Sequence, residues 1–265
     1  MSKDNIIPMA VWNDRWKRED LLTTRPRIRR PTTVPDCFAR ELSQKRRYPY
    51  RLTGLPPGYE AIYRRGGWEK IDTPQIDEPG FEDLYVRLRT TFAWVLEGDR
   101  KVAAVQLREI DAELVADWCF WEAMDAHSQD LTRWAEVILS LWPPLWIELF
   151  GYGPVLEIEN VWVEPRHPRP GIWKPVAHAL ADRIMRKSSI LTAHVFPEEY
   201  NGRVPRGART EPAFDRRRDA MMRVCEREFG LKPMPHWGKD GFMWRPRAGL
   251  ERIVGKPEYR PNWEE

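Results

Sequence analysis

The alternation of strand-like and helix-like segments through the central and C-terminal parts of the chain restricts its fold most strongly. Two apolar runs, 92–96 and 102–107, flank the polar, glycine-containing sequence EGDRK and predict a β-hairpin. Further apolar strands are expected at 155–163, 190–196 and 241–244, and amphipathic helices lie between them. One mixed β-sheet with helices on its faces satisfies this order, so we expect an α/β (α+β) domain.

Three segments carry the periodicity of amphipathic helices. In residues 114–142, apolar side chains recur at steps of three and four, and Ser128 can cap a second helix within this stretch. Residues 173–187 and 214–229 predict two more helices. Gly230 follows the last of them directly, which is typical of a helix C-terminus.

The composition divides the chain into three parts. Residues 1–58 are rich in proline and arginine, and we expect an arm with little regular structure because proline fixes φ and removes a backbone donor. Residues 59–245 are expected to form the domain, with a helical insert at about 112–150. Residues 246–265 form a second segment rich in proline and arginine, which we expect to be a tail.

The net charge of +3 hides a strong asymmetry. Residues 1–51 and 165–265 are basic, whereas residues 97–164 are acidic. This pattern suits contacts with phosphates or acidic partners, or association between copies of the chain. A solvated surface with local clusters of charge explains it equally well.

Cysteine, histidine and hydropathy exclude several kinds of protein. Cys37, Cys119 and Cys225 are widely spaced and form no C-x-x-C pair, so neither a zinc site nor a disulfide framework is predicted. The five histidines form no i, i+4 pair, so no metal site is expected. The sequence shows no signal peptide and no apolar run of about 18 residues, so we expect a cytoplasmic protein without membrane contact.

A series of motifs extends over residues 155–244: the strand VLEIENVWVEP, the turn RHPRPGIW, the helix KPVAHALADRIM, the strand ILTAHVF and the helix RDAMMRVCEREFGL. Together they resemble the GCN5-related N-acetyltransferase (GNAT) superfamily. In addition, AMDAHSQDL in the helical insert resembles a segment of phage- or plasmid-associated acetyltransferase-like proteins. The resemblance implies a GNAT-like central sheet with flanking helices, a gap beside a splayed strand, and acetyl-CoA or another acyl-CoA in that gap.

The resemblance also implies where the cofactor binds. In the family, backbone amides of the turn hold the pyrophosphate at a helix N-terminus, and small residues let the backbone approach. Gly171 matches that pattern, but Pro168 and Trp173 depart from it, so the cofactor site is expected to be altered. The implied cofactor-binding residues are Val161, Val163, Arg166, Arg169, Gly171 and Trp173.

Acyl transfer to an amine needs a base for the amine and an acid for the leaving thiolate. Glu157 and Glu159 are the candidate bases, because burial in an apolar strand raises a carboxyl pKa. The alternative is that they pair with arginine or face water. The resemblance places the family's tyrosine acid on the helix 214–229, but that helix has no tyrosine, and Cys225 or Glu226 stands where it is expected. Tyr200, in the loop before the helix, is the nearest substitute.

Two functions follow from these residues. One is an acyl-CoA-dependent N-acyltransferase with a divergent cofactor site. The other is a catalytically inactive GNAT-fold structural or interaction subunit of a larger assembly, such as a phage particle, located in the host cytoplasm or the virion. The N-terminal arm is then expected to bind protein partners or further copies of the chain, and arginine-rich segments such as Arg216–Arg218 are candidates for nucleic-acid contact.

Overall fold

The structure is a computed structural model, and it describes residues 36–43, 47–71, 86–112, 117–142, 146–169, 171–197 and 211–254. The chain divides into two units, Met1–Arg30 and Pro31–Glu265. All the described residues belong to the second unit.

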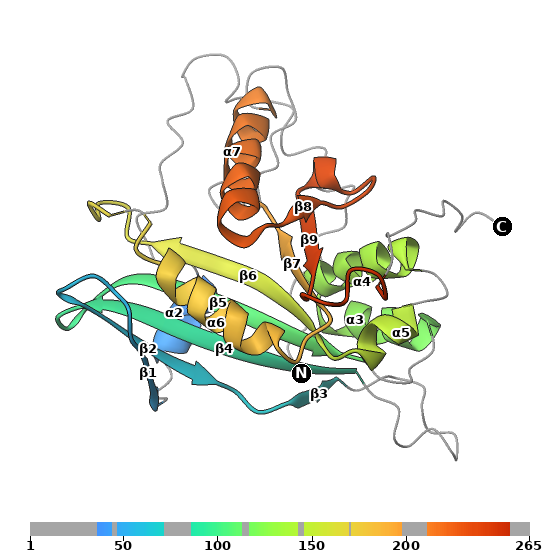
Figure 1. Cartoon of the computed structure of the whole chain (residues 1–265), viewed down its shortest axis with the longest axis horizontal. Helices are drawn as coiled ribbons and strands as arrows, with labels where there is room; N and C mark the ends of the chain where they lie inside the picture. Colours follow the sequence, from blue (N-terminus) through green and yellow to red (C-terminus); the bar gives the residue numbers. More distant parts are fainter. Residues whose placement is uncertain are drawn as a thin grey trace, which may run out of the picture. The chain divides into compact units, whose positions relative to one another are not determined.

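The second unit is built on a nine-stranded mixed sheet in its described residues (Figure 1). The strand order is β1-β2-β4-β5-β6-β7-β9-β8, and β3 pairs with β4. Only the β6–β7 pair is parallel among the pairs described. The strands are β1 Tyr50–Leu52, β2 Tyr59–Arg65, β3 Glu69–Ile71, β4 Val86–Glu97, β5 Arg100–Asp111, β6 Val155–Val163, β7 Ile190–His194, β8 Lys232–Pro233 and β9 Phe242–Pro246.

Helices cover both faces of the sheet. The described helices are α2 Asp36–Ser43, α3 Asp117–His127, α4 Gln129–Leu141, α5 Trp146–Gly151, α6 Lys174–Met185, α7 Glu211–Phe229 and the short 3₁₀ helix η2 Gly238–Asp240. Side chains of α3, α4 and α5 form one core cluster with β4, β5 and β6, and this side is called the α3–α4 face. Side chains of α6 and α7 form a second cluster on the opposite side, the α6–α7 face. The expected mixed α/β architecture is confirmed.

Most of the elements expected from periodicity are present. The hairpin is formed by β4 and β5, which pair antiparallel and are longer than the apolar runs that predict them. Ser128 caps α4, because its side chain accepts a hydrogen bond from the Leu131 amide at 3.3 Å. Helix α7 ends before Gly230, whose φ of +64° is the left-handed conformation expected of a helix C-terminus.

The segment expected to be irregular contains regular structure in its described part. Helix α2 packs on the α3–α4 face, where Phe38 is buried against Phe92 and Trp94 at ring-centroid distances of 6.3 and 5.7 Å. The Glu41 side chain of this helix accepts hydrogen bonds from Tyr48 and Arg64. Tertiary packing therefore stabilises a helix that local composition does not predict. Residues 1–35 of the predicted arm lie outside the described residues.

The C-terminal segment also differs from the expectation of a tail. Leu250 and Val254 are buried in the cluster on the α3–α4 face. The indole nitrogen of Trp142 donates to the Val254 carbonyl oxygen at 3.1 Å. Leu250 and Val254 therefore anchor this segment to the packed core, while residues 251–253 between them are exposed. Within the described residues, no helix is both long enough and apolar enough to cross a membrane.

Candidate functional site

The parallel strands β6 and β7 are hydrogen-bonded over only part of their length and then separate. Their register runs from Leu156–Leu191 to Ile158–Ala193. Strand β6 nevertheless continues to Val163, and among the described residues its second half has no partner strand on the β7 side. Figure 1 shows the two strands diverging, and the end of their pairing after Ile158–Ala193 is called the β6–β7 gap.

A β-bulge lies at the start of the gap. The pairing of β6 with β5 passes from Ile158–Leu107 directly to Asn160–Gln106, which leaves Glu159 as the extra residue. A bulge bends the strand and redirects the side chains around it. As a result, Glu159 and Asn160 both contact Gln106 of β5, although they are neighbours in sequence.

A buried polar cluster occupies the α3–α4 face at this bulge. The Arg108 guanidinium donates from Nε and Nη2 to Oε2 of Glu157 at 2.9 and 2.7 Å. Its Nη1 donates to Oε1 of Glu159 at 3.2 Å. The other Glu159 oxygen accepts from Nε2 of Gln106 at 2.6 Å. Arg108 thus joins Glu157 and Glu159, the two carboxylates expected to be candidate bases. The alternative expectation, that these carboxylates pair with arginine, is met by the same contacts.

Burial sets the charge states in this cluster. The Glu157 side chain has only 6% of its surface exposed, whereas the Glu159 side chain has 20% exposed. Desolvation raises the pKa of Glu159 and Glu157 raises it further, while Arg108 and the Gln106 hydrogen bond lower it. Burial opposes the charge on Arg108, but the two carboxylates outweigh it and raise its pKa.

Strand β7 and helix α4 add polar groups on the same face. Thr192 lies opposite Glu157 in the register, and its hydroxyl accepts a hydrogen bond from the Trp134 indole at 3.4 Å. His194, two residues further, stacks on Phe242 with a ring-centroid distance of 4.2 Å. Burial lowers the pKa of His194, and so does the charge of Arg133.

The histidine was not predicted to belong to the site. His194 carries no local motif, because its role depends on the pairing of β7 with β6 and β9. The only sequence signal is the two-residue period of a strand, which places residues 192 and 194 on one face.

The turn before α6 lies on the α6–α7 face. Trp173 stacks on Phe229 of α7 at 6.0 Å between ring centroids, and His178 stacks on the same ring at 4.7 Å. Lys174 Nζ donates to Glu228 Oε1 at 2.7 Å. This hydrogen bond is the main cause that lowers the pKa of Glu228 to about 2. These contacts tie the start of α6 to the end of α7.

The residues that precede this turn are held by β2. The buried His167 ring accepts from the Arg169 amide at 3.2 Å and lies 3.3 Å from the Tyr59 hydroxyl. The Arg169 guanidinium lies 5.5 Å from the centre of the Tyr59 ring. Arg169 is therefore directed at β2, and both Arg166 and Arg169 are exposed. A Cβ added at Gly171 would lie 3.3 Å from the Lys174 side chain, so that side chain covers the turn.

The other expected site residues are spread over the domain. Val161 is 37% exposed beyond the bulge, and Val163 packs on the α6–α7 face. Cys225 packs on that same face, so the sheet separates it from the two carboxylates, and burial raises its pKa to about 11. Tyr200 lies outside the described residues. The described part of the chain holds no group of three or more His, Cys, Asp or Glu arranged for a metal ion.

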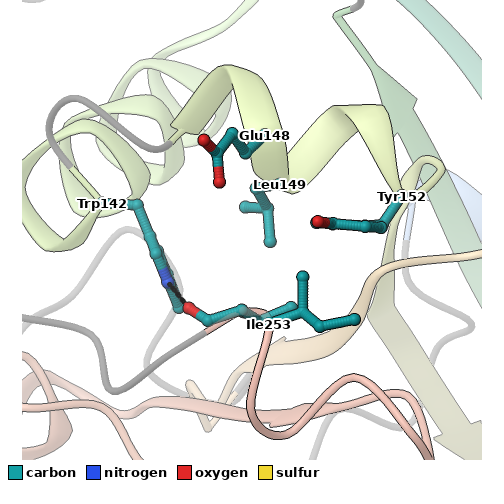
Figure 2. A pocket seen from close by; sticks show the side chains of 6 residues that line it. Trp142, Glu148, Leu149, Tyr152 and Ile253 are labelled. Carbon is teal, nitrogen blue, oxygen red and sulfur yellow. Dashed lines mark hydrogen bonds between the residues drawn. The ribbon is translucent and has the colours of Figure 1, made fainter.

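A small pocket lies elsewhere, between α4, α5 and the turn that ends at Val254 (Figure 2). Its lining residues are Trp142, Glu148, Leu149, Tyr152, Ile253 and Val254. Glu148 is the only titratable carboxylate among them, and no basic side chain lines the pocket. The cluster at the β6–β7 gap is therefore the stronger candidate for chemistry.

No protein-family model, no curated protein and no solved structure matches the chain. The function must therefore be argued from the side chains themselves.

Proposed function

We propose that this chain is an acyl-CoA-dependent N-acyltransferase of the GNAT type with a divergent cofactor site. The observation that carries the proposal is the parting of the parallel strands β6 and β7 after Ile158–Ala193, with two carboxylates at the bulge. A strand without a ladder partner presents backbone donors and acceptors. The amide-bearing arm of an acyl-CoA can pair with them along residues 159–163.

Glu159 is the proposed general base. The amine nitrogen attacks the thioester carbonyl carbon, a C–N bond forms, the C–S bond breaks, and the amine proton passes to the Glu159 carboxylate. The thiolate then takes its proton from water. Burial raises the pKa of Glu159 toward neutral pH. A general base works best when its pKa lies near the pH of the reaction.

Glu157 is less suited to this role. Its side chain is almost fully buried, with 6% of its surface exposed. Glu159 lies at the bulge and is the more exposed of the two. A base must reach the proton that it removes, so exposure favours Glu159.

The proposed cofactor phosphates lie at the start of α6. The helix dipole favours an anion at such a terminus, but Pro175 has no amide hydrogen and the Lys174 amide already donates to the Gly171 carbonyl oxygen at 3.1 Å. Arg166 is exposed beside the turn, and Lys174 is close to Gly171. Lys174 is paired with Glu228 in this structure, so binding of a phosphate there requires Lys174 to exchange one anionic partner for another.

A second function is favoured by the contacts between α6 and α7. The Trp173 and His178 rings stack on Phe229, and Lys174 pairs with Glu228, so these contacts join the start of α6 to the end of α7. The resemblance to the family implies that the cofactor runs close to this turn. A domain locked in this way is the expected state of the alternative, an inactive structural or interaction subunit of a larger assembly.

Calorimetric titration with acetyl-CoA separates the two functions. We expect the wild-type protein to bind with a micromolar Kd, and the Trp173→Gly variant to bind at least as tightly, because the indole then no longer restricts the turn. Trp68→Gly is the matched control, since Trp68 stacks on Arg89 far along the chain from this turn, and its Kd should equal that of the wild type. Binding by Trp173→Gly alone, or by neither protein, would contradict the proposed activity and favour the structural subunit.

A further inference from the structure

We infer that Arg108 is the positioning residue of the candidate site: Glu157 anchors its guanidinium, which in turn holds the Glu159 carboxylate at the β6–β7 gap. The consequence for catalysis rests on the proposed function. The arrangement itself concerns the chain alone and can be measured without any activity.

The geometry of the guanidinium supports this division of roles. Nε and Nη2 form one edge of the planar group, and both donate to Glu157. With that edge fixed, the remaining nitrogen, Nη1, is directed at Glu159. A planar fork with fixed donors transmits orientation in this way, whereas a lysine ammonium is a point charge on a flexible stem.

A second contact orients Glu159 from the other side. Gln106 donates to Oε2 of Glu159 at 2.6 Å, and its own carbonyl oxygen accepts from Nδ2 of Asn160 at 3.3 Å. Both Glu159 oxygens are therefore held, one by Arg108 and one by Gln106. The bulge makes this possible because it places Glu159 and Asn160 against the same residue of β5.

The burial of these charges also needs an explanation. The cluster lies between the aromatic cluster of Phe38, Trp94 and Trp162 and the larger apolar cluster of α3 and α4. Well-packed apolar side chains are often as stabilising as a buried ion pair, because desolvation of the charges is costly. Stability alone therefore does not account for Arg108, Glu157 and Glu159, and a role in orienting a reactive carboxylate does.

Four neighbours act on the Glu159 carboxylate through charge or hydrogen bonding. Arg108 and Gln106 on β5 favour its ionised form, while Glu157 on β6 and Asp130 on α4 disfavour it. Two further titratable or charged groups lie beside these neighbours. His194 on β7 interacts with Glu157 and Asp130, and Arg133 on α4 interacts with His194. Arg108 and Glu157 therefore act on Glu159 with opposite signs.

Carbon-13 NMR titration of the glutamate carboxyl groups tests the inference, with the Glu159 signal assigned by its loss in Glu159→Gln. In Arg108→Gln, the pKa of Glu159 should rise by about one unit or more. In Glu157→Gln, which keeps the size of the side chain, it should fall. Arg108→Lys keeps the charge but loses the fork, so it should leave this pKa close to the wild-type value while lowering the acyl-transfer rate. In Arg108→Gln and Glu157→Gln, the acidic limb of the acyl-transfer rate should move in the same direction as the pKa of Glu159.

The matched control is Arg89→Gln, which removes an arginine from the Glu109 ion pair on the opposite face of the sheet. It should leave the Glu159 pKa unchanged. Shifts of the same sign in Arg108→Gln and Glu157→Gln, or no shift in Glu157→Gln, would overturn the inference. Opposite shifts in a protein that transfers no acyl group would support the coupling of Arg108 and Glu157 to Glu159 and contradict the proposed function.

Discussion

Replacing Glu159 with glutamine is expected to lower the rate constant of acyl transfer by about 100- to 10,000-fold, which is the usual contribution of a positioned acid or base. Glutamine keeps the size of the side chain and can still bond with Arg108 and Gln106, but it cannot take the proton of the amine. The measurement is the release of CoA thiol from acetyl-CoA in the presence of a primary amine.

The matched control is Glu60→Gln, because Glu60 is an exposed glutamate of β2 that pairs with Arg51 at the surface. This variant should keep the wild-type rate. A Glu159→Gln rate within a few-fold of the wild type would show that another group takes the proton. In that case the carboxylates at the bulge would have only a structural role.

The same substitution has a predictable effect on stability. Burial raises the pKa of Glu159 in the folded state. The stability that this residue contributes is then fully present below the unfolded-state pKa of about 4.3 and is lost as the pH rises through the folded-state pKa. Glu159→Gln lacks this loss, so its thermal unfolding should depend less on pH above the usual range of a carboxyl group. If the wild-type protein holds a reactive carboxylate at a cost to its stability, Glu159→Gln should lower the rate of acyl transfer without lowering the melting temperature.

Gly153→Ala is expected to lower the free energy of unfolding by more than about 3 kcal/mol, or the melting temperature by about 10 °C. Gly153 has a φ of +116°, a conformation that is strained for a residue with a Cβ. A Cβ there would lie 2.1 Å from the Lys187 carbonyl oxygen, so the backbone on one side must move. Chemical denaturation of the two proteins measures the difference.

Gly54→Ala is the control that separates the cost of the backbone conformation from the cost of the contact with Lys187. Gly54 has a φ of +92°, and a Cβ there would meet no atom within 4 Å, so only the strain of about 1–2 kcal/mol applies. Equal losses in the two variants would show that the approach of Gly153 to Lys187 is unimportant. That approach lies beside the hydrogen bond from the Ser189 amide to the Pro154 carbonyl oxygen. The glycine therefore maintains the closed end of the β6–β7 pair, from which the gap opens.

The elements with a regular apolar period could be predicted from the sequence, and those made by tertiary contact could not. The hairpin of β4 and β5 and the strand–helix–strand unit of β6, α6 and β7 follow from alternation and periodicity alone. Helix α2 is stabilised by Phe38 against the rings of Phe92 and Trp94, more than fifty residues away in sequence. No local pattern indicates that contact.

The candidate site could likewise be predicted only where its residues follow a local pattern. Glu157 and Glu159 could be singled out because two carboxylates two residues apart share one face of an apolar strand. Arg108 could not, because its position beside them depends on the register of β5 with β6 and on the bulge at Glu159. For the same reason the sequence indicates a large side chain in the turn at Trp173, but not its stacking on Phe229 of α7.

Hydrogen–deuterium exchange of residues 159–163 with and without saturating acetyl-CoA tests most directly whether the β6–β7 gap is the thioester site. Acetyl-CoA should slow exchange of these amides, because the acyl-CoA arm replaces the missing partner strand beyond Ile158–Ala193. Strands β1 and β2, at the far edge of the sheet, should exchange as before. Unchanged exchange at residues 159–163, or protection confined to another part of the chain, would contradict this account.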